Sequence, residues 1–167
     1  LPFDRRRNGM IPGMGAVGLV VEEAGQVSER GMRPLSRLLG SEIANSAFHG
    51  TRLDTEHIAG RMENFIERMC QEHGLERARL ARELVFVSHE TYTPARGGSA
   101  SAEVAALRRA FGPDARHIII ANTKGFTGHP MAAGIEDAAA ARMLQHQQVP
   151  PIANHRETDP ELGDLQL

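Results

Sequence analysis

Residues 117–134, HIIIANTKGFTGHPMAAG, carry a β-branched apolar run that leads into a segment rich in glycine and polar side chains. The run 117–121 is typical of a short buried strand, and the segment after it is typical of a turn into a helix. Pro130 suits the first turn of that helix, because its missing N–H costs nothing there. We expect the helix to continue through Ala138 to about Gln145.

The same alternation of strand and helix occurs upstream of this stretch. Residues 84–87 are a predicted strand with His89 just past its end, and residues 101–111 are a predicted helix. Between residues 55 and 73, apolar side chains recur at spacings of three and four, which predicts a helix that Gly74 ends. Its apolar stripe comprises Ile58, Met62, Phe65, Ile66 and Met69. Strands and helices at these spacings predict βαβ crossovers and a mostly parallel sheet, an α/β fold.

The two ends of the chain have weaker periodicity. Residues 17–21 form an apolar run that predicts a short buried strand, and a second strand is expected within residues 35–48. A helical turn is expected within residues 26–34. Arg5 to Arg7 are interpreted as solvated surface, and the tail from Pro150 is expected to be irregular.

The composition is that of a globular domain. The 167 residues are 41% hydrophobic and 24% charged, and the net charge of −2 gives no reason to expect nucleic acid or an anionic membrane as partner. No apolar run approaches the roughly 18 to 20 residues needed to cross a bilayer, and no signal peptide is visible. The single cysteine, Cys70, excludes an intrachain disulfide and favours a reducing, cytoplasmic location.

Candidate functional side chains follow both predicted strands. His89 lies at the end of the first strand, and Lys124 lies just beyond the second, with His129 one short loop later. In parallel α/β folds, catalytic groups collect at the carboxyl ends of strands. Two neutral imidazoles can donate N–H bonds to one carbonyl oxygen, and a nearby ammonium favours developing negative charge. These residue types therefore suit the stabilisation of an enolate or a tetrahedral oxyanion.

Each of these residues also has an ordinary structural interpretation. A histidine after a strand is commonly a loop residue or a hydrogen-bonded core group, and a lone lysine is commonly a surface charge. Cys70 lies within a helical stripe and is interpreted as a small hydrophobe, because a catalytic thiolate needs an electropositive or helix-terminal setting. The eight histidines have spacings that match no established metal pattern, so no metal site is expected.

Four segments, taken together and in order, resemble one family of condensing enzymes. PFDRRRNGMIPGMGAVGLVVEE (residues 2–23) is similar to a Pro-Phe-Asp … Arg-x-Gly … Gly-x-Gly … Leu-Glu segment, and SHETYTPARGGSASAEVAALRRAFG (88–112) occupies the place of a His-Gly-Thr-Gly-Thr-Pro … Glu … Phe-Gly segment. NTKGFTGHPMAAGIEDA (122–138) resembles a Thr-Lys … Gly-His … Ala-Gly segment, and VPPIANHRETDPEL (149–162) resembles a Pro-Pro … Asn … Asp-Pro-Glu tail. The family is that of the β-ketoacyl synthases of fatty-acid and polyketide assembly, and the resemblance covers nearly all of the chain.

The resemblance implies a thiolase-like fold, in which two similar βαβ halves stack as α/β layers with mixed, mostly parallel sheets. Residues 1–167 would comprise the end of the N-terminal half and most of the C-terminal half of one ketosynthase domain. The family's nucleophilic cysteine would lie upstream of this chain, since Cys70 does not match it, and the final glycine-rich segment would follow Leu167. The start LPFDRRRNG, without a methionine, also reads as the middle of a longer protein.

The activity implied by the resemblance is a decarboxylative Claisen condensation, an acyltransferase reaction of the intact parent that this fragment alone would not perform. An upstream cysteine would hold the acyl group, and malonyl would enter on the phosphopantetheine arm of acyl carrier protein, with no other cofactor. The intact parent is expected to be a homodimer that binds acyl and malonyl thioesters.

Site residues are implied position by position. His89 and His129 match the two active-site histidines, which would hold the malonyl thioester carbonyl as carbon dioxide leaves. Lys124 matches the family's lysine, which supports the histidines electrostatically. Thr91 and Thr93 match threonines that contact the pantetheine arm.

The chain departs from the family pattern in the first histidine motif. Glu90 and Tyr92 replace its two glycines, and the loop 95–102 is about three residues longer than usual and lacks the customary aspartate. Glu103 therefore aligns only after that insertion. We expect an unusual branch, such as part of a large multidomain synthase, with a reshaped pantetheine entrance that Tyr92 could either narrow or supply with a hydroxyl.

Two other functions stay open at this point. The chain could belong to a non-catalytic ketosynthase-like subunit that sets chain length or stabilises a dimer, or to a thiolase-like enzyme that uses acyl-CoA without decarboxylation. The histidines and the lysine favour the condensing enzyme over both. The acyl chain length and the choice between a fatty-acid and a polyketide pathway are not indicated by these residues.

Overall fold

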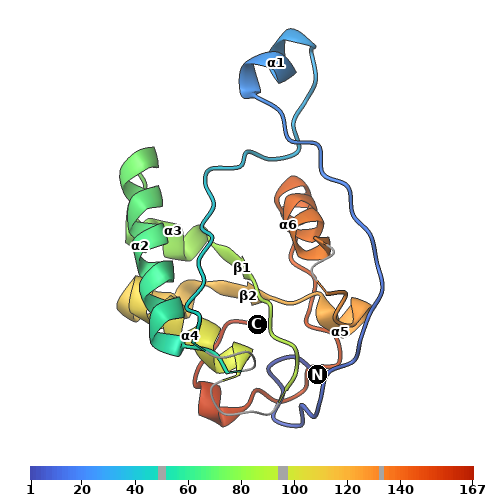
Figure 1. Ribbon diagram of the computed structural model, residues 1–167, viewed down its shortest axis with the longest axis vertical. Coiled ribbons are helices and arrows are strands. Elements are labelled where there is room, and N and C mark those ends of the chain that lie inside the picture. The colour runs from blue at the N-terminus through green and yellow to red at the C-terminus, as the bar shows by residue number, and fades with distance from the viewer. Residues whose placement is uncertain (49–51, 94–97, 132–133) are drawn as a thin grey trace.

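The computed structural model is an α/β structure in which a short parallel sheet lies between two groups of helices (Figure 1). It describes residues 1–48, 52–93, 98–131 and 134–167. In chain order the elements are α1 Ala24–Glu29, α2 Thr55–His73, α3 Arg77–Glu83, β1 Val85–Val87, α4 Ser99–Phe111, the 3-10 helix η1 Gly112–His117, β2 Ile119–Ala121, α5 Lys124–Thr127, α6 Ile135–His146 and the 3-10 helix η2 Pro160–Leu162. Among these described residues, no helix is long and apolar enough to span a bilayer.

The sheet has the parallel arrangement that the sequence predicts. β1 and β2 are joined by the crossover helix α4, and their paired residues are Val85 with Ile119, Phe86 with Ile120, and Val87 with Ala121. A further parallel bridge joins Ile119 to Gln166 in the C-terminal segment. Because β1 and β2 run in the same direction, the residues that follow them, from Ser88 and from Asn122, begin at the same edge of the sheet.

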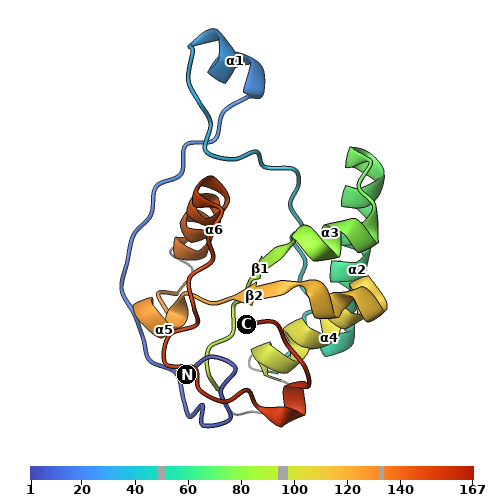
Figure 2. The same ribbon diagram turned by 180° about the vertical axis from the view of Figure 1, so that it is seen from behind.

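The core lies where α4 packs between α2 and the sheet. α4 is rich in alanine, which lets α2 approach closely along its length, and Leu107 and Phe111 fill the space beneath it. The buried core cluster comprises Phe3, Ile66, Ala81, Ala100, Val104, Leu107, Ala110, Phe111, Ile118, Ile120, Ile152 and Leu162. In both views, α2, α3 and α4 lie on one side of the strands and α6 on the other (Figure 2).

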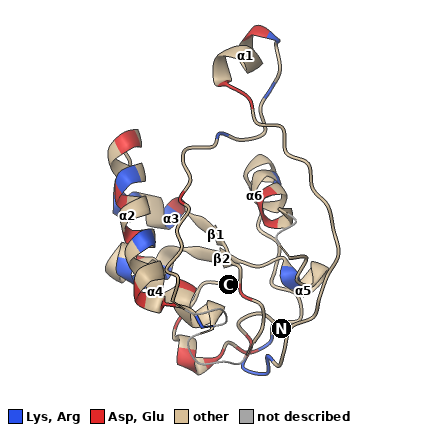
Figure 3. Cartoon of the chain, viewed as in Figure 1, with Lys and Arg blue, Asp and Glu red and all other residues tan. Residues whose placement is uncertain are grey.

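α2 follows the predicted bounds because its ends are fixed locally. The Asp54 side chain accepts a hydrogen bond of 3.0 Å from the His57 backbone N–H, which satisfies one of the free donors of the first turn. Gly74 ends the helix in the left-handed conformation that glycine adopts without strain. Ile66 and Met69 of the predicted stripe are buried, and acidic and basic residues alternate over the outer face (Figure 3).

The predicted strands of the N-terminal third are wrong. Residues 17–21 and residues 35–48 are extended, and most of their apolar side chains are exposed in a long excursion interrupted by α1 (Figure 1). A strand needs a neighbour for its N–H and C=O groups, and none of the described residues forms a ladder with these runs. The helical turn expected within residues 26–34 is α1, which begins two residues earlier.

The helix predicted from Pro130 is also wrong in its start, since α6 begins at Ile135. Met131 has a φ of 52° and Gly134, the residue before α6, a φ of 71°, so neither has the backbone of a right-handed helix. The short helices α5 and α3 were not predicted. α3 depends on the Glu76 carboxylate, which accepts hydrogen bonds from the backbone N–H groups of Ala78 and Arg79 at 2.9 and 2.7 Å.

Candidate active site

The three predicted catalytic residues converge at the carboxyl edge of the sheet. His89 follows β1, Lys124 is the first residue of α5 after β2, and His129 follows α5. The imidazole centroids of His89 and His129 are 5.2 Å apart, with the rings edge to face at 82°. His129 and Lys124 are buried, whereas His89 is exposed to solvent. Two of these three side chains are therefore buried, and the His89 imidazole is accessible to solvent.

Lys124 is a buried charge with a partner, which excludes its interpretation as a surface charge. Its Nζ donates a hydrogen bond to the Glu136 carboxylate in the first turn of α6. Burial pushes the pKa of Glu136 upward, but the bond and the charge of Lys124, together with a backbone hydrogen bond and the charge of His89, leave the pKa below its ordinary value. Sequence reasoning missed Glu136, although the residue stands in the quoted segment 122–138, two positions after its last glycine.

The electrostatics of the site favour a neutral His89. Partial burial lowers its pKa below the ordinary value of 6.5, and the nearby charges of Lys124 and His129 lower it further, while Glu136 opposes them. A neutral imidazole carries one N–H and one free nitrogen, so it can donate to a carbonyl oxygen without bringing a full charge. Among the described residues, the buried Nδ1 atom of His129 has no hydrogen-bond partner.

The backbone of His89 is fixed by Glu103 of α4. The Glu103 carboxylate accepts a hydrogen bond of 2.8 Å from the His89 N–H and a second bond from the Ser88 hydroxyl. Burial raises the pKa of Glu103 to about 7. The longer loop predicted at residues 95–102 lies partly outside the described residues, which omit 94–97, and α4 begins within it at Ser99.

His129 is fixed by the N-terminal segment. Its backbone N–H donates to the Ile11 carbonyl at 2.8 Å, and its carbonyl accepts from the Gly13 N–H at 2.9 Å. Asn122 joins the ends of the two strands, because its side-chain amide donates to the Glu90 carbonyl at 3.0 Å while its oxygen accepts from the Lys124 N–H at 2.9 Å. The backbone N–H groups of His89, Lys124 and His129 are therefore each hydrogen-bonded, to Glu103, Asn122 and Ile11 respectively.

Thr91 and Thr93 lie on the loop after β1, and both are half-buried. The Thr91 N–H donates to the Ser99 hydroxyl at 3.3 Å, and the Thr93 carbonyl accepts from Arg7 Nε at 3.1 Å. The loop backbone is thus ordered on both sides of Tyr92. The pantetheine contacts of the two threonines stay a prediction.

Arg7 is buried, so its interpretation as solvated surface is wrong. It donates to Asp159 Oδ2 at 2.5 Å, and its Nε lies 3.9 Å from Glu90 Oε1. Glu90 is fully buried, and this burial raises the pKa of its carboxyl, which the Arg7 charge partly offsets. Arg7 therefore ties the N-terminal segment to the loop after β1 and to the C-terminal tail. Arg5 is exposed, as predicted.

From the sequence, Tyr92 could either narrow the pantetheine entrance or supply it with a hydroxyl, and the structure places its side chain in the interior. Its side chain is only 2% exposed, so it does not project from the loop into an entrance. Its hydroxyl instead lies 3.2 Å from the Ile11 carbonyl oxygen and 3.3 Å from the Lys124 carbonyl oxygen. The residue has a φ of 53°, a left-handed conformation that suits the glycine it replaces.

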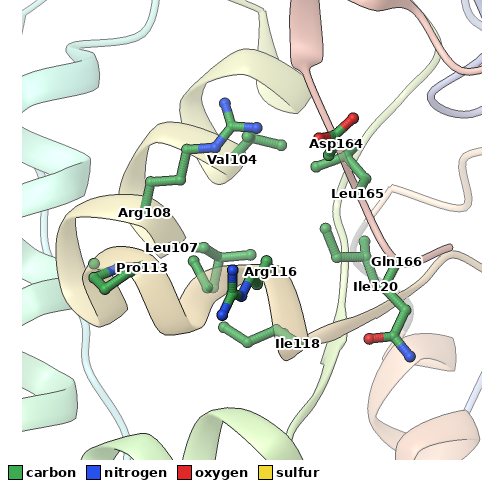
Figure 4. A pocket seen from close by; sticks show the side chains of 12 residues that line it. Val104, Leu107, Arg108, Pro113, Arg116, Ile118, Ile120, Asp164, Leu165 and Gln166 are labelled. Atoms are coloured by element: carbon green, nitrogen blue, oxygen red, sulfur yellow. The ribbon is translucent and has the colours of Figure 1, made fainter.

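A cavity of about 270 Å³ lies away from these residues, between α4, η1 and the C-terminal segment (Figure 4). Its walls combine apolar side chains such as Leu107 and Ile118 with the guanidinium groups of Arg108 and Arg116. None of the predicted site residues lines it. Cys70 lies on α2, packs against the core as a free thiol, and has the position of a small hydrophobe.

The chain matches the family model described as the C-terminal domain of β-ketoacyl synthase over residues 35–156. It is 30% identical to 3-oxoacyl-[acyl-carrier-protein] synthase 2 of Coxiella burnetii, over 95% of this chain and 37% of the relative. The chain therefore spans little more than a third of the length of the curated relatives it matches.

Two solved structures have the same arrangement of elements. The ishigamide ketosynthase/chain length factor matches with a TM-score of 0.81 and 29% identity, over 99% of this chain and 39% of the other. The AntDE:AntF complex, a type II PKS acyl carrier protein with its ketosynthase bound to the hexaketide, matches with a TM-score of 0.80 and 26% identity, again over 99% and 39%.

Proposed function

Because this chain belongs to the β-ketoacyl synthase family and has its thiolase-like α/β fold, we propose that it forms the C-terminal part of a condensing enzyme. The intact parent would transfer an acyl group onto the carbanion of a malonyl thioester, and this chain alone would be inactive. The observation that carries the proposal is the convergence of His89, Lys124 and His129 at one edge of the sheet. The relatives named 3-oxoacyl-[acyl-carrier-protein] synthase support the same reaction class.

In the proposed reaction, the N–H groups of His89 and His129 donate to the carbonyl oxygen of the malonyl thioester. As carbon dioxide leaves, the electron pair of the broken C–C bond moves onto the thioester as an enolate, and its oxygen gains negative charge. The carbanion carbon then attacks the acyl thioester carbonyl and forms the new C–C bond, while the C–S bond to the upstream cysteine breaks and the cysteine leaves as a thiolate. Each donor to such an oxyanion is worth about 10²–10³ in rate.

The roles of Lys124 and Glu136 in this proposal are electrostatic. Partial burial lowers the pKa of His89 and the ammonium lowers it further, so both favour a neutral imidazole that acts as a hydrogen-bond donor. The bond to Glu136 holds the ammonium in place and limits the cost of burying it.

The proposed substrate carrier is the phosphopantetheine arm of acyl carrier protein, with Thr91 and Thr93 as the candidate contacts to the arm and no further cofactor. A relative structure that holds a ketosynthase with its acyl carrier protein supports this partner. A homodimeric parent and a cytoplasmic location belong to the same proposal.

A second candidate function is that of a non-catalytic partner subunit, which the match to the ishigamide ketosynthase/chain length factor keeps open. The replacement of two motif glycines by Glu90 and Tyr92 is the observation that favours it. The facing imidazoles and the buried Lys124–Glu136 pair favour catalysis. The residue at the nucleophile position of the parent discriminates between the two: cysteine for the enzyme, and another residue for the partner subunit.

The proposed role of His129 is tested by decarboxylation of malonyl-carrier protein with the intact parent. We predict that His129→Ala lowers the rate by about 10²–10³, because one of the two oxyanion donors is lost. His146→Ala is the matched control, since this histidine is exposed at the end of α6. Equal rates for His129→Ala and the unaltered parent would contradict the role given to His129.

A further inference from the structure

Tyr92 has an unusual backbone for its residue type. Its φ of 53° lies in the left-handed region, which a bulky side chain enters only when the surrounding structure holds it there. The ring is almost completely buried, at 2% exposure. Contacts with the surrounding structure must therefore hold Tyr92 in this conformation.

The hydroxyl of Tyr92 lies near two carbonyl oxygens that also accept backbone hydrogen bonds at the site. The Ile11 carbonyl that lies 3.2 Å from Tyr92 Oη also accepts the backbone N–H of His129, at 2.8 Å. The Lys124 carbonyl that lies 3.3 Å from Tyr92 Oη also accepts the N–H of Gly128, at 2.9 Å. The hydroxyl has one proton, so both of its bonds are longer than the usual O–H···O distance.

Tyr92 thereby connects the backbone segments that carry His89, Lys124 and His129. It follows His89 by three positions on the same loop, and its hydroxyl reaches the first residue of α5 and the carbonyl that fixes His129. Burial raises the pKa of Tyr92, and the nearby Glu90 carboxylate raises it further, so the phenol keeps its proton and remains a donor. A glycine at this position has no side chain with which to make these contacts.

We propose that Tyr92 is a positioning residue, whose hydroxyl sets the distance between His89 and His129 by linking the loop after β1 to Ile11 and Lys124. This inference rests on the proposed function, since it concerns the geometry of the same two imidazoles. It assigns Tyr92 no contact with the substrate. The expected effect is on the rate of the chemical step, because the oxyanion donors act only in a narrow geometry.

The test compares Tyr92→Phe with the unaltered protein in the intact parent. Phenylalanine keeps the ring and removes only the hydroxyl. We expect kcat for decarboxylation of malonyl-carrier protein to fall about tenfold with KM unchanged, less than the roughly 10²-fold that a 1 Å misplacement can cost. Backbone hydrogen exchange measured by mass spectrometry should accelerate in residues 124–131, with no change in α2.

Thr158→Val is the matched control, because it removes a hydroxyl whose side-chain contact is with His155 in the C-terminal tail. This variant should leave both kcat and the exchange of residues 124–131 unchanged. Faster exchange throughout the protein in Tyr92→Phe would indicate a general loss of stability and would overturn the inference. A raised KM with unchanged kcat would make Tyr92 a binding residue and would also overturn it.

His129→Ala, assayed in parallel, separates the two proposals. If His129→Ala decarboxylates at the unaltered rate, the proposed function itself fails. If the rate depends on His129 but Tyr92→Phe retains the full kcat, the inference about Tyr92 fails alone.

Discussion

At the scale of single residues, the loop after β1 contains and contacts several buried polar groups. Ser88 and Glu90 are fully buried, and Glu103 accepts hydrogen bonds from both Ser88 and His89. A buried carboxyl is costly in its charged form even when it is hydrogen-bonded. The raised pKa of Glu103 records that cost.

This cost predicts how stability depends on pH. The pKa of Glu103 is about 7 in the fold and 4.5 ordinarily, which corresponds to about 3 kcal/mol. The pKa of Glu103 is higher in the folded than in the unfolded state, so its contribution to the free energy of unfolding is fully present below pH 4.5. That contribution is lost as the pH rises through 7. We predict that the free energy of unfolding of the unaltered parent falls, relative to Glu103→Gln, between about pH 5 and about pH 8.

Denaturant unfolding of both proteins across this range measures the difference. Carboxyls with a lowered pKa, such as Asp4 and Asp159, act in the opposite direction but are common to both proteins, so their effect cancels. Parallel pH curves for the two proteins would show that Glu103 does not titrate as described.

At the scale of elements, the N-terminal segment and the loop carrying His129 approach at backbone distance. Pro12 and His129 form a parallel bridge, and Gly13 packs against α5 so closely that a Cβ atom there would lie 2.1 Å from the Thr127 carbonyl oxygen. The glycine is therefore required by the close approach of two backbones. The position of His129 depends on a residue more than a hundred positions upstream.

This close approach predicts that Gly13→Ala destabilises the intact parent by roughly 1–3 kcal/mol, as overpacking of a tight contact does, and lowers decarboxylation with it. Gly60→Ala is the matched control, since the Cβ added there, inside α2, would meet only the Arg109 side chain at 3.8 Å. The control should not lose stability, because alanine is the better helix former by roughly 0.5–1 kcal/mol. Thermal melts and the decarboxylation assay check both variants, and equal behaviour of the two would contradict the close contact.

The elements show where prediction from the sequence succeeds and where it fails. α2 was predictable because the Asp54 cap, the apolar stripe and Gly74 are all local. The late start of α6 was not, because the left-handed backbone of Met131 and Gly134 interrupts the segment that the pattern assigns to a helix. An apolar run such as 17–21 predicts a strand only if a neighbouring strand exists, which the run itself does not encode.

The candidate site likewise contains residues that the sequence predicts and residues that it does not. His89, Lys124 and His129 were predictable because each stands next to a recognisable strand or within a family motif. Glu136 and the contacts of Tyr92 were not, because they depend on how α6 and the N-terminal segment fold back onto the loop after β1. Sequence patterns locate residues along the chain, whereas these pairings are set by tertiary structure.

At the scale of the whole molecule, the N-terminal segment makes a long excursion away from the sheet (Figure 1). Its apolar side chains are exposed to solvent: Met14, Val20 and Ile43 are 96%, 88% and 95% exposed. Large exposed apolar areas mark contacts with other protein. In the proposed parent, the rest of the ketosynthase would cover it.

We therefore predict that the 167-residue chain expressed alone self-associates, because these side chains gain by leaving water. Sedimentation velocity over a range of concentrations measures this, and the double variant Val20→Lys with Ile43→Lys should associate less. A soluble monomer that unfolds in one sharp cooperative transition would contradict the prediction.

The two ends of the chain meet beside the site, and this has a consequence for synthesis. The Arg5 N–H donates to the Glu157 carbonyl, and Arg7 pairs with Asp159, in each case across 152 residues. A ribosome that adds 5–20 residues per second needs about 8–30 s to cover that separation. Throughout this interval the guanidinium of Arg7 stays hydrated, so the contact of Arg7 with Asp159 forms only after that residue has been synthesised.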